Sequence, residues 1–203
     1  MIYERYWEQN QGEALTDFPT KWPKLAAYIP KGSRNVIVDF GCGSGALIRE
    51  MRTVNPNARY IGLDVSSTAL NTAARRDPRA EWHKIEDGRS FPVRDGVADF
   101  VFSSEVIEHV YDTQNAFAEM ARITRAGGRL LLTTPYHGFA KNLALVLRGF
   151  ENHFDPAGPH IRFFTKRNLF RALTDAGFQL VKHGYYGRFF PFSHSIYVVA
   201  EKI

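Results

Sequence analysis

The stretch at residues 35–45, NVIVDFGCGSG, combines a short apolar run with three closely spaced glycines. Its first six residues predict a buried strand, because apolar side chains dominate a short run that ends in glycines. Gly41, Gly43 and Gly45 allow the backbone to turn sharply and to approach a ligand. A helical pattern follows over residues 44–54, and the start of a helix presents backbone N–H groups without partners. The stretch therefore predicts a ligand-binding loop between a strand and a helix.

The alternation of strand and helix continues along the chain. Further strands are expected at residues 59–63, 81–85, 98–103 and 129–134, the last stopped by Pro135, and helices at 66–76 and 113–124. Ser66 or Ser67 is the expected N-terminal cap of the helix at 66–76, and Gly127-Gly128 are expected to end the helix at 113–124. Such alternation indicates an α/β fold with a doubly wound, mostly parallel sheet covered on both faces.

The alternation stops after Pro135. Residues 136–164, rich in His, Gly and aromatic side chains, follow the carboxyl end of a strand and are interpreted as a substrate cap with a short helix at 142–148. A helix at 165–176, ended by Gly177, and strands at 179–185 and 195–200 complete the expected elements. Residues 1–30 are interpreted as a helical flank or lid. The whole chain, 1–203, is predicted to be a single domain.

The composition is that of a globular protein. The 203 residues are 44% hydrophobic and 23% charged, unlike disordered or fibrous chains. No apolar run reaches the ~20 residues needed to span a bilayer, and the first residues are too polar for a secretory signal. A single cysteine, Cys42, excludes an internal disulfide. A cytoplasmic location is expected, with peripheral membrane contact as an alternative.

The net charge of +5 lies in the last third of the chain. Residues 137–203 hold nine Lys and Arg against four Asp and Glu, whereas residues 1–136 are neutral. A basic, aromatic segment suits an anionic, aromatic or lipid-linked partner, and a solvated helix face over a Phe-rich core is the alternative. Residues 143–147, LALVL, are interpreted as core, with a membrane contact or an acyl pocket as the alternative.

Three carboxylates follow three successive strands. Asp39 ends the first strand and favours a cationic group of the ligand, since it would repel a pyrophosphate. Asp64 ends the second strand, where an acid can accept both hydroxyls of a ribose. Asp87 follows the third strand, in a position to accept from an exocyclic amine. Together they predict a ligand with an amine, a ribose and an adenine-like base.

These stretches resemble the motifs of the class I S-adenosylmethionine-dependent methyltransferases. VIVDFGCGSG is similar to their glycine-rich motif, GLDVS to their ribose motif and EDGRSFP to their adenine motif. The resemblance implies a seven-stranded sheet whose last strand is antiparallel, and S-adenosylmethionine as the cofactor. It assigns that cofactor to Asp39, Gly41, Cys42, Gly43, Gly45, Asp64, Val65, Asp87, Gly88 and Ser104.

Residues 105–109, EVIEH, form a second informative cluster. On a helix, Glu105, Glu108 and His109 would share one face and offer a ligand set for Mg²⁺ or Mn²⁺. The stretch resembles that of ubiquinone-pathway O-methyltransferases and small-RNA 2′-O-methyltransferases, which implies a further histidine from the cap. His160 is the candidate for that metal ligand, with His153 or His137 as substitutes.

A histidine base is the alternative to a metal. His109, His137 and His160 are the candidates, because imidazole titrates near neutrality. The predicted reaction is methyl transfer to a hydroxyl of a small molecule: a quinone or phenol, a sugar or a lipid precursor. An RNA 2′-O-methyltransferase and an NAD-dependent oxidoreductase are the alternatives. The (N/D)PP(Y/F) tetrapeptide of enzymes that methylate base amines is absent, which argues against that chemistry.

Overall fold

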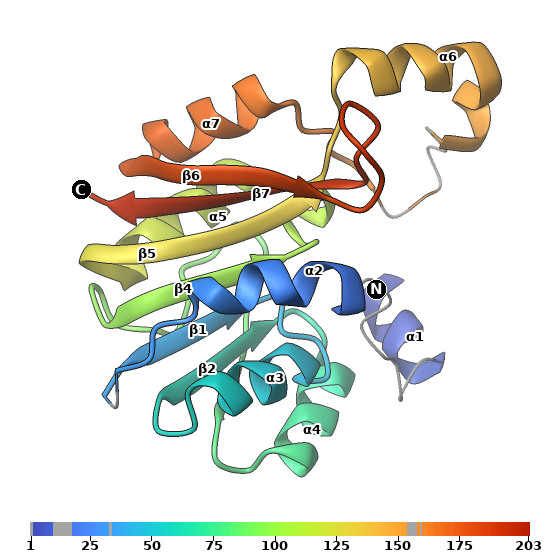
Figure 1. Ribbon diagram of the computed structural model, residues 1–203. Helices are drawn as coiled ribbons and strands as arrows, with labels where there is room; N and C mark the ends of the chain where they lie inside the picture. The colour runs from blue at the N-terminus through green and yellow to red at the C-terminus, as the bar shows by residue number, and fades with distance from the viewer. Residues whose placement is uncertain (1, 10–17, 33, 154–157, 159) are drawn as a thin grey trace.

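The centre of the molecule is one seven-stranded sheet (Figure 1). The computed structural model describes residues 2–9, 18–32, 34–153, 158 and 160–203. The strands lie in the order β3-β2-β1-β4-β5-β7-β6. Their bounds are Val36–Phe40 (β1), Arg59–Asp64 (β2), Glu81–Lys84 (β3), Ala98–Ser104 (β4), Thr124–Pro135 (β5), Phe178–Tyr186 (β6) and Ser195–Lys202 (β7). Only β7 runs antiparallel to its neighbours, so the expected α/β sheet is confirmed.

Helices cover both faces of the sheet (Figure 1). Their bounds are Ile2–Gln9 (α1), Phe18–Leu25 (α2), Ala46–Val54 (α3), Ser67–Arg76 (α4), Thr113–Ile123 (α5), Phe139–His153 (α6) and Lys166–Asp175 (α7), with short 3₁₀ turns at Ala26–Tyr28 (η1) and Ile107–His109 (η2). The Ser66 side chain accepts a hydrogen bond from the Ala69 backbone N–H, which confirms the expected cap of α4.

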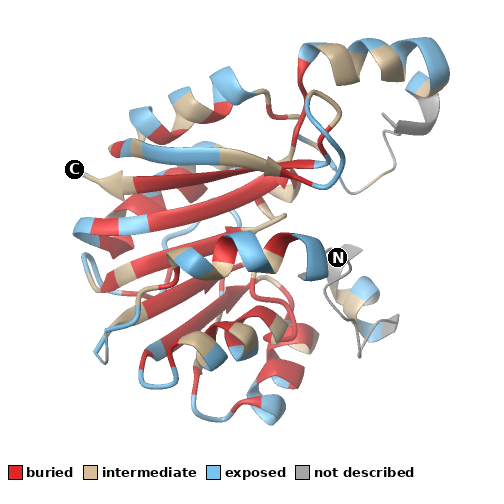
Figure 2. Cartoon of the chain, viewed as in Figure 1, coloured by how far each residue is buried: buried red, intermediate tan, exposed pale blue. Residues whose placement is uncertain are grey.

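Two apolar cores hold the layers together, one on each face of the sheet. In one, Leu25 and Ile29 of the N-terminal segment join α3 residues against Phe100 and Phe102. In the other, residues of α5 and α7 pack against the opposite side chains of the same strands, for example Val101 and Leu132. Figure 2 shows the strands as mostly buried between these layers. Side chains that alternate along each strand therefore serve both cores.

Several element bounds differ from the sequence prediction, most of all around β5 and α6. Helix α5 ends at Ile123 and β5 begins at Thr124, so Gly127-Gly128 lie inside the strand range and do not end the helix. Pro135 is the last residue of β5, where it pairs with Ser195. The helix expected at 142–148 is longer, because α6 starts directly after the 136–138 turn and continues across a kink at Gly149.

Helices α1 and α6, from the segments expected to be a flank or lid and a cap, lie off the end of the sheet to which the parallel strands point. In Figure 1 they lie on either side of the tips of β1 and β4. The expected flank at residues 1–30 contains α1, α2 and η1, and its residues 1 and 10–17 lie outside the described residues. The expected cap at 136–164 contains α6, and residues 154–157 and 159 lie outside the described part. Among the described helices, none has the length and apolar character needed to span a bilayer.

Candidate active site

The glycine loop turns back on the end of β2. The backbone N–H groups of Gly41 and Cys42 both donate to the Leu63 carbonyl, at 2.8 and 3.0 Å. Gly41, Gly43 and Gly45 have φ angles of 78°, 50° and 76°, in the region that side chains disfavour. A Cβ atom at Gly41 would collide with Val106. The glycines expected from the sequence are therefore needed for both the turn and the close packing.

Asp39 presents an unsatisfied carboxylate oxygen at the end of β1. The residue is fully buried, and among the described residues its Oδ2 has no hydrogen-bond partner. Burial and the neighbouring Asp64 raise the pKa of Asp39 to about 8, although Lys21 opposes this rise. A buried carboxylate of this kind is suited to receive a cationic group from a ligand, because an ion pair would offset the cost of its burial.

Lys21 of α2 brings a positive charge to the same end of the sheet as Asp39. Its side chain is 6% exposed, and its Nζ donates to Ser104 Oγ at 3.0 Å. The lysine charge also lowers the pKa of Asp39 and of Glu108, against the effect of their burial. Asp39 and Lys21 together complement a zwitterion, as found in the amino acid end of S-adenosylmethionine. Sequence reasoning missed Lys21, since a single lysine in an amphipathic helix gives no signal.

Asp64 ties the glycine loop to the start of α4. Its Oδ2 accepts from the Gly43 N–H at 2.8 Å, and its Oδ1 accepts from the Ser66 N–H at 2.9 Å. Burial raises the pKa of Asp64 against these backbone hydrogen bonds, which favour the charged form. The next residue, Val65, is half-buried. Asp64 thus lies beside the glycine loop, and each of its carboxylate oxygens accepts one hydrogen bond from a backbone N–H.

Asp87 links the loop after β3 to the turn after η2. Its two carboxylate oxygens accept from the backbone N–H groups of Tyr111 and Asp112, at 2.8 and 3.2 Å. The residue is exposed, and Gly88 beside it has a φ of 72°. A carboxylate oxygen can accept more than one hydrogen bond, so Asp87 retains the capacity to accept from an adenine amine.

The N-terminal helix contacts the cofactor loop through two side chains that the sequence did not identify. Glu4 accepts from Ser66 Oγ at 2.8 Å and from the N–H groups of Ser67 and Thr68 at 2.7 and 3.2 Å. It therefore caps α4 from another helix. The Trp7 ring lies against Gly43, where an added Cβ would approach Cζ2 to 2.5 Å. These contacts place α1 over the loop, as a lid would be.

The stabilising effect of Glu4 on the start of α4 should depend on pH. Burial acts in the opposite direction, but the hydrogen bonds from Ser67, Ser66 and Thr68 lower the pKa of Glu4 to about 2 from its usual 4.5. Its stabilising effect should therefore be present above pH 4.5 and disappear as the pH falls from 4.5 toward 2. Replacing Glu4 by Ala removes a helix cap, and amide exchange at Ser67 and Thr68 should become about ten-fold faster. Hydrogen–deuterium exchange at neutral pH measures this.

Glu8 provides the matched control for Glu4. It lies on the same helix with an exposed side chain, so Glu8→Ala should leave exchange at Ser67 and Thr68 unchanged. Equal protection of these amides in the Glu4→Ala variant would contradict the capping role.

Glu105 is directed away from its expected partners. Residues 105–109 do not form one helix: only Ile107–His109 make a 3₁₀ turn, and Glu105 has a φ of 55°. Its Oε1 accepts from Thr133 Oγ1 at 2.7 Å and from the Tyr186 hydroxyl at 2.6 Å, while Ser195 donates to Oε2 at 3.2 Å. The prediction that Glu105 shares a helix face with Glu108 and His109 is therefore wrong. Strands β5, β6 and β7 hold this carboxylate instead.

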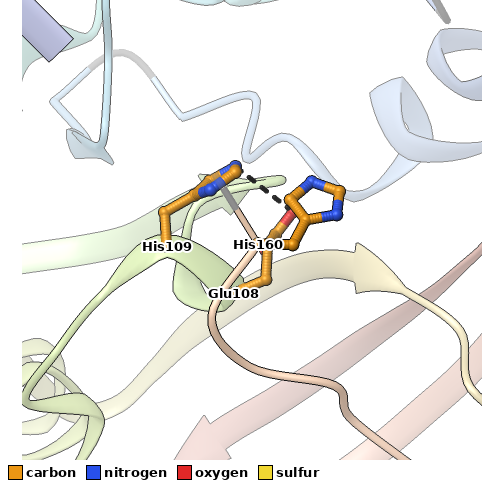
Figure 3. Close-up of side chains that lie close together, drawn as sticks. All are labelled: Glu108, His109 and His160. Carbon is orange, nitrogen blue, oxygen red and sulfur yellow. Dashed lines mark ion pairs between the residues drawn. The ribbon is translucent and has the colours of Figure 1, made fainter. Parts of the chain in front are cut away.

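Glu108, His109 and His160 do come together (Figure 3). One ligand atom from each lies within 4.8 Å of the others, and the two imidazole centres are 4.8 Å apart. Glu108 is 1% exposed; its Oε2 accepts from Thr134 Oγ1, and its Oε1 lies 3.9 Å from His109 Nε2. No described residue makes a hydrogen bond to that Oε1. Burial and the charge of Glu105 raise the pKa of Glu108 well above its usual value.

The backbone explains how a distant histidine reaches this cluster. The Glu108 carbonyl accepts from the N–H groups of Ile161 and Arg162, each at 3.0 Å, so the chain beside His160 is fixed on η2. His137 has a different setting: it is buried, its Nδ1 lies 3.2 Å from Asn142 Oδ1, and its ring contacts Phe163. The side chain of His153, the other substitute, lies outside the described part of the chain.

Ser104 and Cys42 complete the expected cofactor set. Ser104 Oγ lies 3.2 Å from Thr133 Oγ1, which donates to Glu105, and it also accepts from Lys21 Nζ. Ser104 therefore lies between the Glu105 carboxylate and Lys21. Cys42 is buried, and burial raises the pKa of its thiol well above the usual value. A neutral, buried thiol acts as a small packing group in the loop.

The chain is similar to known methyltransferases over most of its length. A family model described as a methyltransferase domain matches residues 6–183. The malonyl-[acyl-carrier protein] O-methyltransferase of Hahella chejuensis is 35% identical over 111 residues, which cover 54% of this chain and 40% of that protein. The ubiquinone biosynthesis O-methyltransferase of Burkholderia pseudomallei is 27% identical over 199 residues, which cover 89% and 81%.

A solved structure has the same fold. The S-adenosylmethionine-dependent methyltransferase from Mesorhizobium loti matches with a TM-score of 0.71 and 19% identity, over 90% of this chain and 97% of that chain. At this identity the likeness concerns the fold alone. The chain spans between 29% and 40% of the length of the first three curated relatives that it matches.

Proposed function

This chain belongs to the family of S-adenosylmethionine-dependent methyltransferases, and from that membership we propose that it transfers a methyl group to a hydroxyl oxygen of a small molecule. The observation that carries the choice of oxygen is the cluster of buried Glu108, partly buried His109 and exposed His160 beyond the carboxyl end of β4. The two relatives described above are both named as O-methyltransferases, which supports the same choice. Family membership gives no support to the NAD-dependent alternative.

The end of β1 is surrounded by side chains whose charges match those of the cofactor. Asp39 would hold the ammonium group and Lys21 the carboxylate, because their charges are opposite and both side chains are buried there. The glycine loop would lie along the cofactor, with Asp64 toward the ribose and Asp87 and Gly88 toward the adenine. When bound, S-adenosylmethionine supplies a methyl group that its sulfonium already activates. The chain must therefore orient the acceptor oxygen, exclude water and remove a proton.

His109 is the proposed base. Its Nε2 would take the hydroxyl proton as the oxygen bonds to the methyl carbon and the methyl–sulfur bond breaks, which leaves S-adenosylhomocysteine as a neutral thioether. Glu108 beside it would stabilise the resulting imidazolium, since its Oε1 lies 3.9 Å from Nε2 and lacks a hydrogen-bond donor among the described residues. The exposed His160 ring, whose centre is 4.8 Å from that of His109, would contact the acceptor. His137, which bonds Asn142, is the weaker candidate.

The same three side chains are also a candidate site for a divalent cation. One carboxylate and two imidazoles would hold the ion, and a bound cation would lower the pKa of a coordinated hydroxyl. Because Glu105 is held elsewhere, the set has one oxygen donor fewer than the sequence suggested. Imidazole-rich sites favour Mn²⁺ over Mg²⁺, which prefers oxygen ligands. We therefore expect Mn²⁺ to bind more tightly than Mg²⁺.

Calorimetric titration tests the cation site. Mn²⁺ should bind the metal-free protein at least about ten-fold more tightly than Mg²⁺, and His160→Ala should weaken Mn²⁺ binding by a similar factor. His183 is the matched control, because it is an exposed histidine on β6 and His183→Ala should bind Mn²⁺ like the parent. Equal Mn²⁺ heats for the parent and His160→Ala would reject the site and leave His109 as the base.

Methyl transfer is tested with labelled S-adenosylmethionine and a panel of acceptors: a catechol, a hydroxyquinone, a sugar and a hydroxy fatty acid, each beside its amine analogue. The proposal expects labelled methyl ethers from a hydroxyl acceptor, and tight binding of S-adenosylhomocysteine by calorimetry. Labelling confined to the amine analogues would overturn O-methylation, and absence of S-adenosylhomocysteine binding by folded protein would overturn the cofactor assignment.

A further inference from the structure

Helix α6 carries an apolar face that no described part of the chain covers. Phe139, Leu143, Val146 and Leu147 are 84%, 48%, 56% and 75% exposed. They lie before the kink at Gly149, at spacings of four, three and one residues, which place them on one side of an α-helix. None of residues 139–150 is buried, and Figure 2 shows α6 projecting from the body in the colours of exposed and intermediate residues.

This exposure corrects the sequence interpretation of residues 143–147 as core. Within that run Ala144 and Leu145 are only partly buried, and the other three residues are exposed. Four exposed apolar side chains on one helix face make that face a candidate contact site. The helix therefore presents its apolar face to something outside the described chain.

A second exposed apolar segment lies beside the same helix. Phe189 and Phe190, in the turn between β6 and β7, are 74% and 61% exposed. The turn is linked to α6 because Lys141 Nζ donates to the His194 carbonyl at 3.3 Å. Figure 1 shows this turn and the start of α6 at the same corner of the molecule. The two segments, residues 139–150 and 187–194, are called the apolar corner below.

The charges of the apolar corner are all of one sign. Its two segments contain Lys141, Arg148 and Arg188 and no acidic residue. Arg148 and Arg188 are exposed, whereas Lys141 is partly buried. Aromatic and aliphatic side chains beside basic ones are the composition with which peripheral proteins bind anionic lipid.

We propose that the apolar corner binds the surface of a bilayer that contains anionic phospholipids. The apolar side chains would enter the boundary between headgroups and acyl chains, and Arg148 and Arg188 would contact lipid phosphates. A second copy of the chain is a poorer partner, because pairing two such corners would bring six like charges together. The proposal concerns a contact with the bilayer surface, and it does not depend on which acceptor is methylated.

The position of the corner relates it to the candidate site. Strand β5 leads through Tyr136 and His137 directly into α6, and the His137 N–H donates to the Phe164 carbonyl of the segment that follows His160. A bilayer bound at the corner would thus lie beside the segment that carries His160. A lipophilic acceptor could then reach the site from the membrane.

Vesicle co-sedimentation tests the proposal. The full chain should sediment with vesicles made of equal parts phosphatidylcholine and phosphatidylglycerol, at least about ten-fold more strongly than with phosphatidylcholine alone. High salt should weaken the binding. Arg148→Gln should reduce the partition coefficient about five-fold, as expected for one basic residue at an anionic surface.

Substitutions at two equally exposed valines, one inside and one outside the apolar corner, test whether the effect on vesicle binding is specific to the corner. Val146 and Val181 are 56% and 52% exposed, and Val181 lies on β6 outside the corner. Val146→Asp should reduce vesicle binding at least about ten-fold, whereas Val181→Asp should bind as the parent does. Binding of S-adenosylhomocysteine by both variants checks that they are folded.

Three results would overturn the proposal. The first is equal or absent sedimentation of the parent with the two kinds of vesicle, which needs no variant. The second is an equal loss of binding in Val146→Asp and Val181→Asp. The third is a parent that self-associates without lipid in light scattering and becomes monomeric in Val146→Asp, which would assign the corner to a second copy.

Discussion

Replacing Asp39 by Asn is expected to weaken binding of S-adenosylmethionine and S-adenosylhomocysteine by about ten- to hundred-fold. The variant loses a charge-assisted hydrogen bond to the ligand ammonium, worth about 1.5–3 kcal/mol, and each 1.4 kcal/mol is a factor of ten. The buried Oδ2, without a partner among the described residues, is the group whose loss produces the effect. Isothermal calorimetry with S-adenosylhomocysteine measures it.

The same substitution should make the protein more stable. The pKa of Asp39 is about 8 in the folded chain and 3.8 in an exposed aspartate, so the folded state binds this proton more tightly. The free energy of unfolding contributed by Asp39 is therefore greatest below pH 3.8 and falls as the pH rises toward 8. An asparagine side chain cannot ionise, so Asp39→Asn should show a higher melting temperature at pH 8 and a flatter dependence on pH.

Proton release when the ligand binds measures the ionisation of Asp39 more directly. Binding a cation favours ionised Asp39, so at pH 7 the parent should release most of one proton when S-adenosylhomocysteine binds, and affinity should increase as the pH rises toward 8. Calorimetry in buffers of different ionisation enthalpy detects the proton. Asp175→Asn, an exposed position on α7, is the control and should behave like the parent. Unchanged proton release in Asp39→Asn would show that another group titrates.

Replacing His109 by Ala is expected to lower kcat about 100- to 10,000-fold while S-adenosylhomocysteine binding stays the same. The imidazole is placed beside the buried Glu108 carboxyl at 3.9 Å, and the proposed reaction requires it to receive the acceptor proton. Steady-state kinetics with the acceptor found in the panel measures the loss. His183→Ala is again the control, since it removes an exposed imidazole from β6.

Glu108→Gln distinguishes the two ways in which the cluster could act. If His109 is the base alone, Gln can still contact the ring, and kcat should fall about ten-fold with little change in metal response. If the cluster holds a cation, loss of the carboxylate should remove Mn²⁺ binding and reduce kcat as far as His109→Ala does. A His109→Ala variant with parental kcat would contradict both roles for this cluster.

Much of the fold followed from local pattern. The short apolar runs at residues 35–40 and 59–63 predicted β1 and β2, and the serine at 66 predicted the cap of α4, as the structure confirms. Hydrophobic period, turn residues and helix caps act over a few residues, so a sequence displays them directly. The glycine loop could also be predicted locally, because positive φ angles favour glycine at those positions whatever the rest of the fold.

The prediction for Glu105 failed because of a local conformation that depends on distant strands. A helix would have aimed it with Glu108, but its carboxylate binds Thr133, Tyr186 and Ser195, which belong to β5, β6 and β7. These three residues lie far from Glu105 in the chain, and Glu105 itself has a φ of 55°. Periodicity along residues 105–109 contains no information about them.

Local sequence pattern was enough to predict the succession of strands and helices along the chain, the ligand loop and the acid at the end of each of the first two strands. The packing of distant elements was needed to show that Lys21 lies at the Asp39 end of the sheet, that Glu4 contacts the start of α4, that His160 is the candidate histidine that joins Glu108, and that α6 has an exposed face. The difference lies in the range of the forces. Backbone hydrogen bonding and turn strain act between near neighbours in the chain, whereas burial and charge pairing depend on how the packed elements bring separate segments together.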